Sequence, residues 1–213
     1  MVPDPDAGAG GGARLLVHFR SVNVVDSLRE RTRHGHIEAI SGGMFSGKSE
    51  ELVRRLRRAT IAGQVVQVFK PATDTRHDPC RLVTRDKREL EAVSVCCSGE
   101  LKARLLPDVR VVGIDEAQFF DLGLVELVSQ LADGGLRVVV AGLDLDYLRR
   151  PFGPMPQILA IAEYVDKMHA VCIRCGAPAH YSQRISGGGE QLLVGDTEAY
   201  EARCRSCFEA FQP

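Results

Sequence analysis

Gly42 to Ser49 read GGMFSGKS, which has the form G-x-x-x-x-G-K-[ST] of a phosphate-binding P-loop. The residues before it, 36–40, alternate like a short strand, and residues 50–56 after it have the apolar spacing of a helix. In such a unit backbone N–H groups face phosphate oxygens, Lys48 adds a positive charge, and the Ser49 hydroxyl can bind Mg²⁺. The stretch therefore predicts binding of a nucleoside triphosphate.

The strand and helix signals around this loop alternate along the chain. Strands are expected at 64–69, 109–114 and 136–141, a helix at 122–131, and a last strand at 166–171. This order predicts an α/β domain with a parallel sheet over residues 35–170. Residues 1–34 form an extension whose first dozen residues are expected to be disordered, and residues 15–25 fit either a short strand or an alternative start site.

The composition limits the partners that the chain could have. It has 213 residues, 45% of them hydrophobic, and 27 basic against 28 acidic residues give a net charge of −1. This balance gives no overall electrostatic reason to expect nucleic acid or an anionic membrane. The sequence also has neither an apolar run of membrane-spanning length nor a signal-peptide core, so we expect a cytoplasmic protein.

Asp115 and Glu116 directly follow a predicted strand, residues 109–114. A carboxylate there would lie at the sheet edge that also carries the P-loop, where Asp115 can hold Mg²⁺ and Glu116 can act as a general base. A solvated acidic pair is the alternative. Whether Glu116 activates water or a substrate hydroxyl distinguishes a triphosphatase from a kinase, and the motif leaves both open.

Four of the seven cysteines form two C-x-x-C pairs: Cys172, Cys175, Cys204 and Cys207. Such pairs are typical of a tetrahedral Zn²⁺ site, although the separation between the pairs is longer than in the usual zinc ribbon. Redox pairs or unrelated buried thiols are the alternatives. A site closed by four thiolates leaves no open position for a substrate, so the predicted zinc is structural and belongs to a small module over residues 171–213.

Five motifs in this order resemble the type II thymidine kinase family. They are GGMFSGKSEELVRRLRR from Gly42, KPATDTR from Lys70, IDEAQFF from Ile114, LDLDYLRRPFG from Leu143, and the two C-x-x-C pairs. The resemblance implies a RecA-like P-loop domain with a zinc-bearing lasso. It also implies transfer of the γ-phosphoryl group of ATP to the 5′-hydroxyl of thymidine, a homotetramer, and feedback inhibition by thymidine triphosphate.

The same resemblance implies roles for individual residues. Glu116 would be the general base on the 5′-hydroxyl. The residues implied at the phosphates and metal are Gly42, Gly43, Met44, Phe45, Ser46, Gly47, Lys48, Ser49, Asp74, Arg76 and Asp115. Those implied around the nucleoside are Met44, Gln118, Phe119, Leu143, Tyr147, Ser182, Leu193, Val194, Gly195 and Tyr200. Ser182 falls where the family often has a Thr that contacts the base, and Tyr200 matches a ribose-side clamp.

Two other functions fit parts of the sequence. A nucleic-acid-dependent ATPase would use the zinc module to bind DNA or RNA, but residues 172–213 contain four arginines against five acidic residues. A structural zinc module with a vestigial P-loop is disfavoured by the intact Lys48, Ser49, Asp115 and Glu116.

Overall fold

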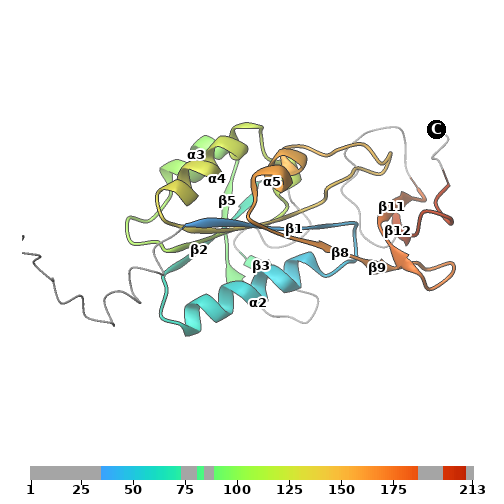
Figure 1. The fold of residues 1–213 in the computed structure, drawn as a ribbon, viewed down its shortest axis with the longest axis horizontal. Coiled ribbons are helices and arrows are strands. Elements are labelled where there is room, and N and C mark those ends of the chain that lie inside the picture. The colour runs from blue at the N-terminus through green and yellow to red at the C-terminus, as the bar shows by residue number, and fades with distance from the viewer. Residues whose placement is uncertain (1–34, 73–80, 84–88, 187–198, 210–213) are drawn as a thin grey trace, which may run out of the picture. The chain divides into compact units, whose positions relative to one another are not determined.

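The computed structural model describes residues 35–72, 81–83, 89–186 and 199–209, and a parallel sheet forms their centre (Figure 1). The sheet has six strands in the order β5-β2-β6-β7-β1-β8. Their bounds are Val93–Val95 for β5, Val66–Pro71 for β2, Val111–Ile114 for β6, Arg137–Gly142 for β7, His36–Gly42 for β1 and Tyr164–Met168 for β8. All five neighbouring pairs are parallel, so the predicted α/β class is confirmed.

Helices cover both faces of this sheet. Helix α2 (Lys48–Ile61) lies on one face, and α3 (Ser98–Ala103), α4 (Gly123–Asp133) and α5 (Met155–Ile161) lie on the other (Figure 1). Strand β7 is apolar along most of its length because both of its faces are buried. Val138 and Val140 join the core under α4 and α5, whereas Val139 and Ala141 join the core under α2. A parallel strand buried on both faces reads as a continuous apolar run.

Helix α2 packs closely against the sheet at Gly113 in β6. A Cβ atom on Gly113 would lie 2.5 Å from Cδ1 of Leu56, a fully buried residue of α2. Because such a distance is shorter than any normal carbon contact, the helix can lie at this height only above a glycine.

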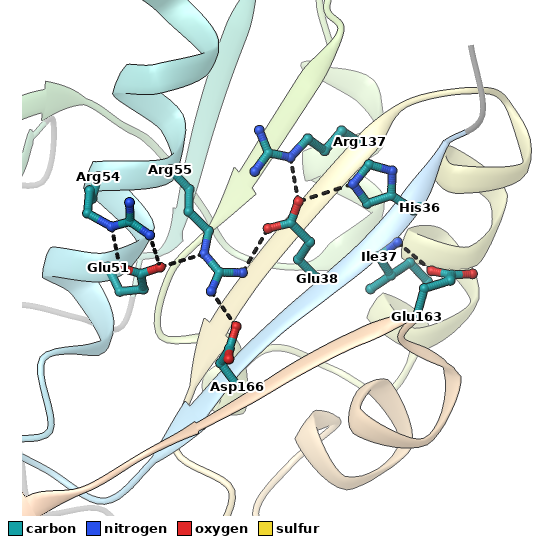
Figure 2. Close-up of polar contacts among 9 residues, drawn as sticks. All are labelled: His36, Ile37, Glu38, Glu51, Arg54, Arg55, Arg137, Glu163 and Asp166. Atoms are coloured by element: carbon teal, nitrogen blue, oxygen red, sulfur yellow. Dashed lines mark hydrogen bonds and ion pairs between the residues drawn. The ribbon is translucent and has the colours of Figure 1, made fainter. Parts of the chain in front are cut away.

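An ion-pair network also fastens α2 to strands β1 and β8 (Figure 2). The Arg55 guanidinium contacts the carboxylates of Glu38 in β1 at 2.8 Å and Asp166 in β8 at 2.5 Å. Arg137 of β7 also contacts Glu38. Since the P-loop ends where α2 begins, these contacts fix the helix that starts at Lys48 relative to the strand before it.

The expected last strand at 166–171 is wrong in detail, because His169 divides it. Residues up to Met168 belong to β8 and extend the main sheet beside β1, whereas β9 (Ala170–Val171) pairs with β10 (Pro178–Ala179). The sequence shows an extended run but not which partner each half takes.

Further strands complete the described part of the chain. Strand β11 (Tyr181–Arg184) pairs with β12 (Tyr200–Arg203), and β3 (Arg81–Val83) pairs with β4 (Glu89–Glu91). Helices α3 and α5 and strand β5 were not predicted. None of the described helices is long and apolar enough to span a bilayer.

Several expectations concern segments outside the described residues: the disordered extension, Asp74 and Arg76, and Leu193, Val194 and Gly195. The domain boundaries at 35–170 and 171–213 stay predictions.

Candidate active site

The phosphate loop connects β1 to α2 through a left-handed backbone. Positive φ angles occur at Gly42 (144°), Phe45 (66°) and Gly47 (84°). Gly47 caps α2 without a side-chain hydrogen bond, so no side chain of the cap covers the first amides of the helix. Ser46 Oγ and Lys48 Nζ each donate to the Gly43 carbonyl at 2.8 Å, which closes the loop on itself. A compact glycine-bearing turn that leads into a helix N-terminus is the kind of backbone that can bind phosphate oxygens.

The Asp115 carboxylate meets this loop where β6 ends. Ser49 Oγ, in the first turn of α2, donates to Asp115 Oδ2 at 2.9 Å. Burial, and next the charge of Glu116, raise the pKa of Asp115 to about 7, although the Ser49 hydrogen bond and the Lys48 charge oppose the shift. A hydroxyl and a carboxylate are hard oxygen donors of the kind that Mg²⁺ prefers, and a buried carboxylate beside a second acid favours a nearby cation. Ser49 and Asp115 together therefore fit a Mg²⁺ ion.

Glu116 has a backbone that its residue type rarely adopts. Its φ of 50° and ψ of 40° lie in the left-handed region, which costs about 1–2 kcal/mol for a residue with a Cβ. Three contacts hold it there. Its N–H donates to Asp115 Oδ1 at 2.9 Å, its carbonyl accepts from Phe119 N at 3.1 Å, and its Oε2 accepts from Gln118 Nε2. Strain that several contacts maintain at a polar site suggests a functional role for the side chain.

Gln118 links Glu116 to the loop that follows β7. While its Nε2 donates to Glu116, its Oε1 accepts from Leu143 N at 2.9 Å, and the residue is almost fully buried. The sequence predicted Gln118 as a nucleoside contact. The structure shows it satisfied on both sides by protein groups, so it orients Glu116; direct contact with substrate stays a prediction.

Two of the three aromatic residues predicted around the nucleoside lie beside the phosphate loop, and the third, Phe119, has a different partner. Tyr147 and Tyr200 are buried in one cluster with Ala199, and Met44 packs against them. Phe119 meets Phe152 edge to face, with ring centroids 5.6 Å apart. Phe152 belongs to the LDLDYLRRPFG motif, but no role was predicted for it. Sequence spacing does not indicate that it pairs with Phe119.

The Ser182 hydroxyl has a partner within the protein that was not expected from the sequence. Its Oγ accepts a hydrogen bond from the backbone N–H of Met44, in the phosphate loop, at 2.9 Å. Because a hydroxyl can accept and donate at once, this contact is compatible with the predicted contact to a base, which stays a prediction.

The four predicted metal ligands come together at the end of the described chain. The sulfur atoms of Cys172, Cys175, Cys204 and Cys207 all lie within 4.8 Å of one another. The Sγ atoms of Cys175 and Cys204 are 3.6 Å apart, too far for a disulfide and close to the edge of a tetrahedron of sulfurs around zinc. Burial opposes ionisation of Cys172, but hydrogen bonds from the backbone around Cys204, Cys175 and Arg174 lower its pKa to about 6. The donor set therefore fits Zn²⁺.

Comparison with known proteins relates this chain to one enzyme family. A family model described as thymidine kinase matches residues 35–208. A thymidine kinase of Porphyromonas gingivalis is 52% identical over 186 residues, which cover 87% of this chain and 89% of that protein. Those of Rhodothermus sp. (51% identical, 87% of each chain) and Bacteroides thetaiotaomicron (47% identical, 86% of this chain and 92% of that one) are similar.

Among solved structures, domain III of the Thermotoga maritima replication initiation protein DnaA shares 16% identity and a TM-score of 0.39 over 68% of this chain and 60% of that chain, too little to bear on function. The matched family segment spans the phosphate loop, the Asp115–Glu116 strand end and all four clustered cysteines. On these grounds the chain belongs to the thymidine kinase family.

Proposed function

We propose that this chain is a thymidine kinase, which transfers the γ-phosphoryl group of ATP to the 5′-hydroxyl of thymidine and releases thymidine monophosphate and ADP. The observation that carries the proposal is the hydrogen bond of 2.9 Å from Ser49 Oγ to Asp115 Oδ2. The next residue, Glu116, has a backbone held in the left-handed region. Membership of the thymidine kinase family supports the choice of substrate.

The phosphate side of the reaction belongs to the loop and the first turn of α2. Backbone N–H groups of residues 43–49, other than that of Met44, which donates to Ser182, would bind the β- and γ-phosphate oxygens, and Lys48 would add charge there. Ser49 and Asp115 would hold Mg²⁺, which when bound neutralises charge that develops on the transferring group. Asp74 and Arg76, outside the described residues, are proposed to complete the phosphate side.

Glu116 is proposed to accept the proton of the 5′-hydroxyl. As the hydroxyl oxygen forms its bond to the γ-phosphorus, the bond from that phosphorus to the β–γ bridging oxygen breaks and ADP leaves. The proton moves to the Glu116 carboxylate, and the hydrogen bond from Gln118 keeps that carboxylate in one orientation.

Met44, Phe119, Leu143, Tyr147, Ser182 and Tyr200 are proposed to form the nucleoside pocket, with Leu193, Val194 and Gly195 supplying backbone contacts to the base. Tyr147 and Tyr200 share a buried cluster against which Met44 of the phosphate loop packs, and this supports their place in the pocket.

The described part of the zinc module weighs against a nucleic-acid-dependent ATPase. Arg174 pairs with Glu209 at 2.7 Å, Arg203 pairs with Glu201, and Arg184 is buried. Three of the four arginines of the module are therefore paired with a carboxylate or buried, and Arg205 alone among them is exposed with no acidic partner among the described residues.

We also propose a structural Zn²⁺ on the four cysteines, a homotetramer, inhibition by thymidine triphosphate, and a cytoplasmic location. A metal site built from four reduced thiols supports a reducing compartment, and family membership supports the assembly and the inhibitor.

The direct test is to incubate the purified chain with Mg²⁺, labelled ATP and single nucleosides. We expect thymidine monophosphate from thymidine, little product from purine nucleosides, and loss of most turnover in Lys48→Ala. ATP hydrolysis that ignores thymidine and rises with added DNA would establish the ATPase instead.

A further inference from the structure

The phosphate loop is in contact with the zinc lobe, by which we mean the described residues 170–186 and 199–209. Strand β11 of this lobe supplies the first contact, because Ser182 Oγ accepts the hydrogen bond from Met44 N at 2.9 Å. Ser182 is only 5% exposed. One amide of the loop is therefore fixed in direction by a side chain that lies 138 positions further along the chain.

The backbones of the two parts approach each other one residue earlier. A Cβ atom on Gly43 would lie 3.1 Å from the carbonyl oxygen of His180 and 3.5 Å from Ser182 Oγ. The chain entering β11 thus lies directly over Gly43, whose carbonyl also accepts the hydrogen bonds of Ser46 and Lys48.

Phe45 provides the third contact and has the least favourable backbone in the loop. Its φ of 66° is left-handed, which costs a non-glycine residue on the order of 1 kcal/mol and persists only when surrounding contacts maintain it. Its ring packs against a cluster of small residues in the zinc lobe that includes two of the metal ligands. The buried members of this cluster are Ala170, Cys172, Ala179, Ala202 and Cys204.

We infer that the zinc lobe holds the phosphate loop in its phosphate-binding form, with Ser182 and Phe45 as positioning residues. The inference rests on the proposed binding of ATP by this loop. Three successive loop residues contact the lobe by different means: Gly43 by close approach, Met44 by a hydrogen bond and Phe45 by packing. A rigid lobe that holds these residues lowers the cost of ordering the loop when phosphate binds.

The test compares Ser182→Ala with Ser182→Thr in the zinc-loaded, full-length protein. Two quantities are measured without thymidine: the affinity for a non-hydrolysable ATP analogue by calorimetry, and amide hydrogen exchange across residues 40–50. Loss of one buried hydrogen bond predicts about fivefold weaker analogue binding and faster exchange in Ser182→Ala. Ser182→Thr keeps the hydroxyl and should restore both. Zinc content is expected to stay at the wild-type value in each variant.

Ser98→Ala is the matched control, because it also removes a hydroxyl hydrogen bond, that of Ser98 Oγ to Asp121 at 2.7 Å, and lies outside the proposed site. It should leave analogue affinity and exchange across residues 40–50 unchanged. Phe45→Leu, which removes the ring but keeps an apolar side chain, should weaken analogue binding in the same direction as Ser182→Ala.

Analogue affinity and loop exchange that stay at wild-type values in both Ser182→Ala and Phe45→Leu would overturn the inference. So would a Ser182→Ala variant whose only defect is a higher KM for thymidine, since Ser182 would then act at the base alone. Failure of the proposed kinase activity is distinguishable, because it would appear in the thymidine assay while analogue binding and exchange still report on the loop.

Discussion

Glu116 combines a strained backbone with a restrained side chain, and both features bear on catalysis. The left-handed backbone turns the chain immediately after Asp115, so the two acids serve different partners: Asp115 accepts from Ser49, and Glu116 accepts from Gln118. A general base needs a fixed direction toward the proton that it removes, and Gln118 supplies that restraint.

Replacing Glu116 with Gln should lower kcat for thymidine by about a hundredfold or more, because the amide cannot accept the proton. Thymidine binding, measured by calorimetry, should stay near the wild-type value. Glu126→Gln, an equivalent change on the exposed side of α4, is the control and should have normal kcat. Turnover close to wild type in Glu116→Gln would show that another group removes the proton.

Tyr200 is 7% exposed and lies in β12 beside Tyr147, with the Arg184 guanidinium centred 4.8 Å from the ring of Tyr147 and 6.0 Å from that of Tyr200. Tyr200→Ala should raise the KM for thymidine roughly tenfold and the KM for ATP much less, since the lost aromatic ring is proposed to line the nucleoside pocket. Tyr164→Ala removes a ring that is 59% exposed on the edge strand β8 and serves as the control. Equal increases in KM for thymidine and for ATP would show that Tyr200 stabilises the fold and has no specific role at the nucleoside.

At the scale of elements, the strand–loop–helix unit of the P-loop was predictable from the sequence. The other helices and strands were predictable only in part. Apart from the expected strand at 166–171, the predicted strands and the helix after β6 are present with shifts of a few residues, because apolar runs and the G-K-S motif are local signals. Helices α3 and α5 are short, at 6 and 7 residues, and have too few turns for a clear period. The contacts of Ser182 with Met44 and of Phe119 with Phe152 join distant segments, so no spacing in the sequence could indicate them.

The network around Arg55 makes the attachment of α2 dependent on pH. Burial alone would raise the pKa of Glu38, but hydrogen bonds from Arg137 and Arg55 and the Arg137 charge lower it to about 2, from 4.5. A lowered folded-state pKa means that the stabilisation is fully present above about pH 4.5 and is lost as the pH falls toward 2.

Glu38→Gln should therefore reduce the free energy of unfolding at pH 7 by on the order of 2 kcal/mol. The difference from wild type should shrink as the pH is lowered below 4.5, because the Glu38 carboxyl group of the unfolded chain then binds a proton that the folded state does not bind until about pH 2. Urea unfolding at several pH values measures the loss of unfolding free energy at pH 7 and its change with pH. A difference that is the same at pH 7 and pH 3 would exclude Glu38 as the titrating group. Glu91→Gln, on an exposed side chain, is the control.

At the scale of the whole molecule, the zinc lobe is expected to depend on a bound metal more than the sheet does. The apolar cluster of the zinc lobe consists of alanines and cysteines, whereas the clusters on both faces of the sheet contain larger aliphatic residues. Small side chains bury little area, so this lobe is expected to draw much of its folding free energy from the metal.

We expect one zinc per chain by metal analysis, and loss of that zinc in Cys204→Ser. Hydrogen exchange should then become faster in residues 170–186 and 199–209, while strand β7 stays protected. Cys96→Ser, which replaces an exposed cysteine remote from the cluster in sequence, should retain the metal. A fully protected lobe in a metal-free Cys204→Ser protein would show that packing alone maintains it.

The contact between Gly113 and Leu56 has a consequence for the reaction geometry. Strand β6 ends one residue before Asp115, and α2 begins with Lys48 and Ser49, so the height of the helix above the strand determines how far the hydroxyl lies from the carboxylate. A methyl group at position 113 would force the helix outward or distort its packing, at about 1–3 kcal/mol. Gly113→Ala should therefore raise the Mg²⁺ concentration needed for half-maximal activity, and Leu56→Val in the same chain should partly restore it. The absence of a side chain at Gly113 thus sets the distance between two oxygens, on different elements, that are proposed to bind the metal.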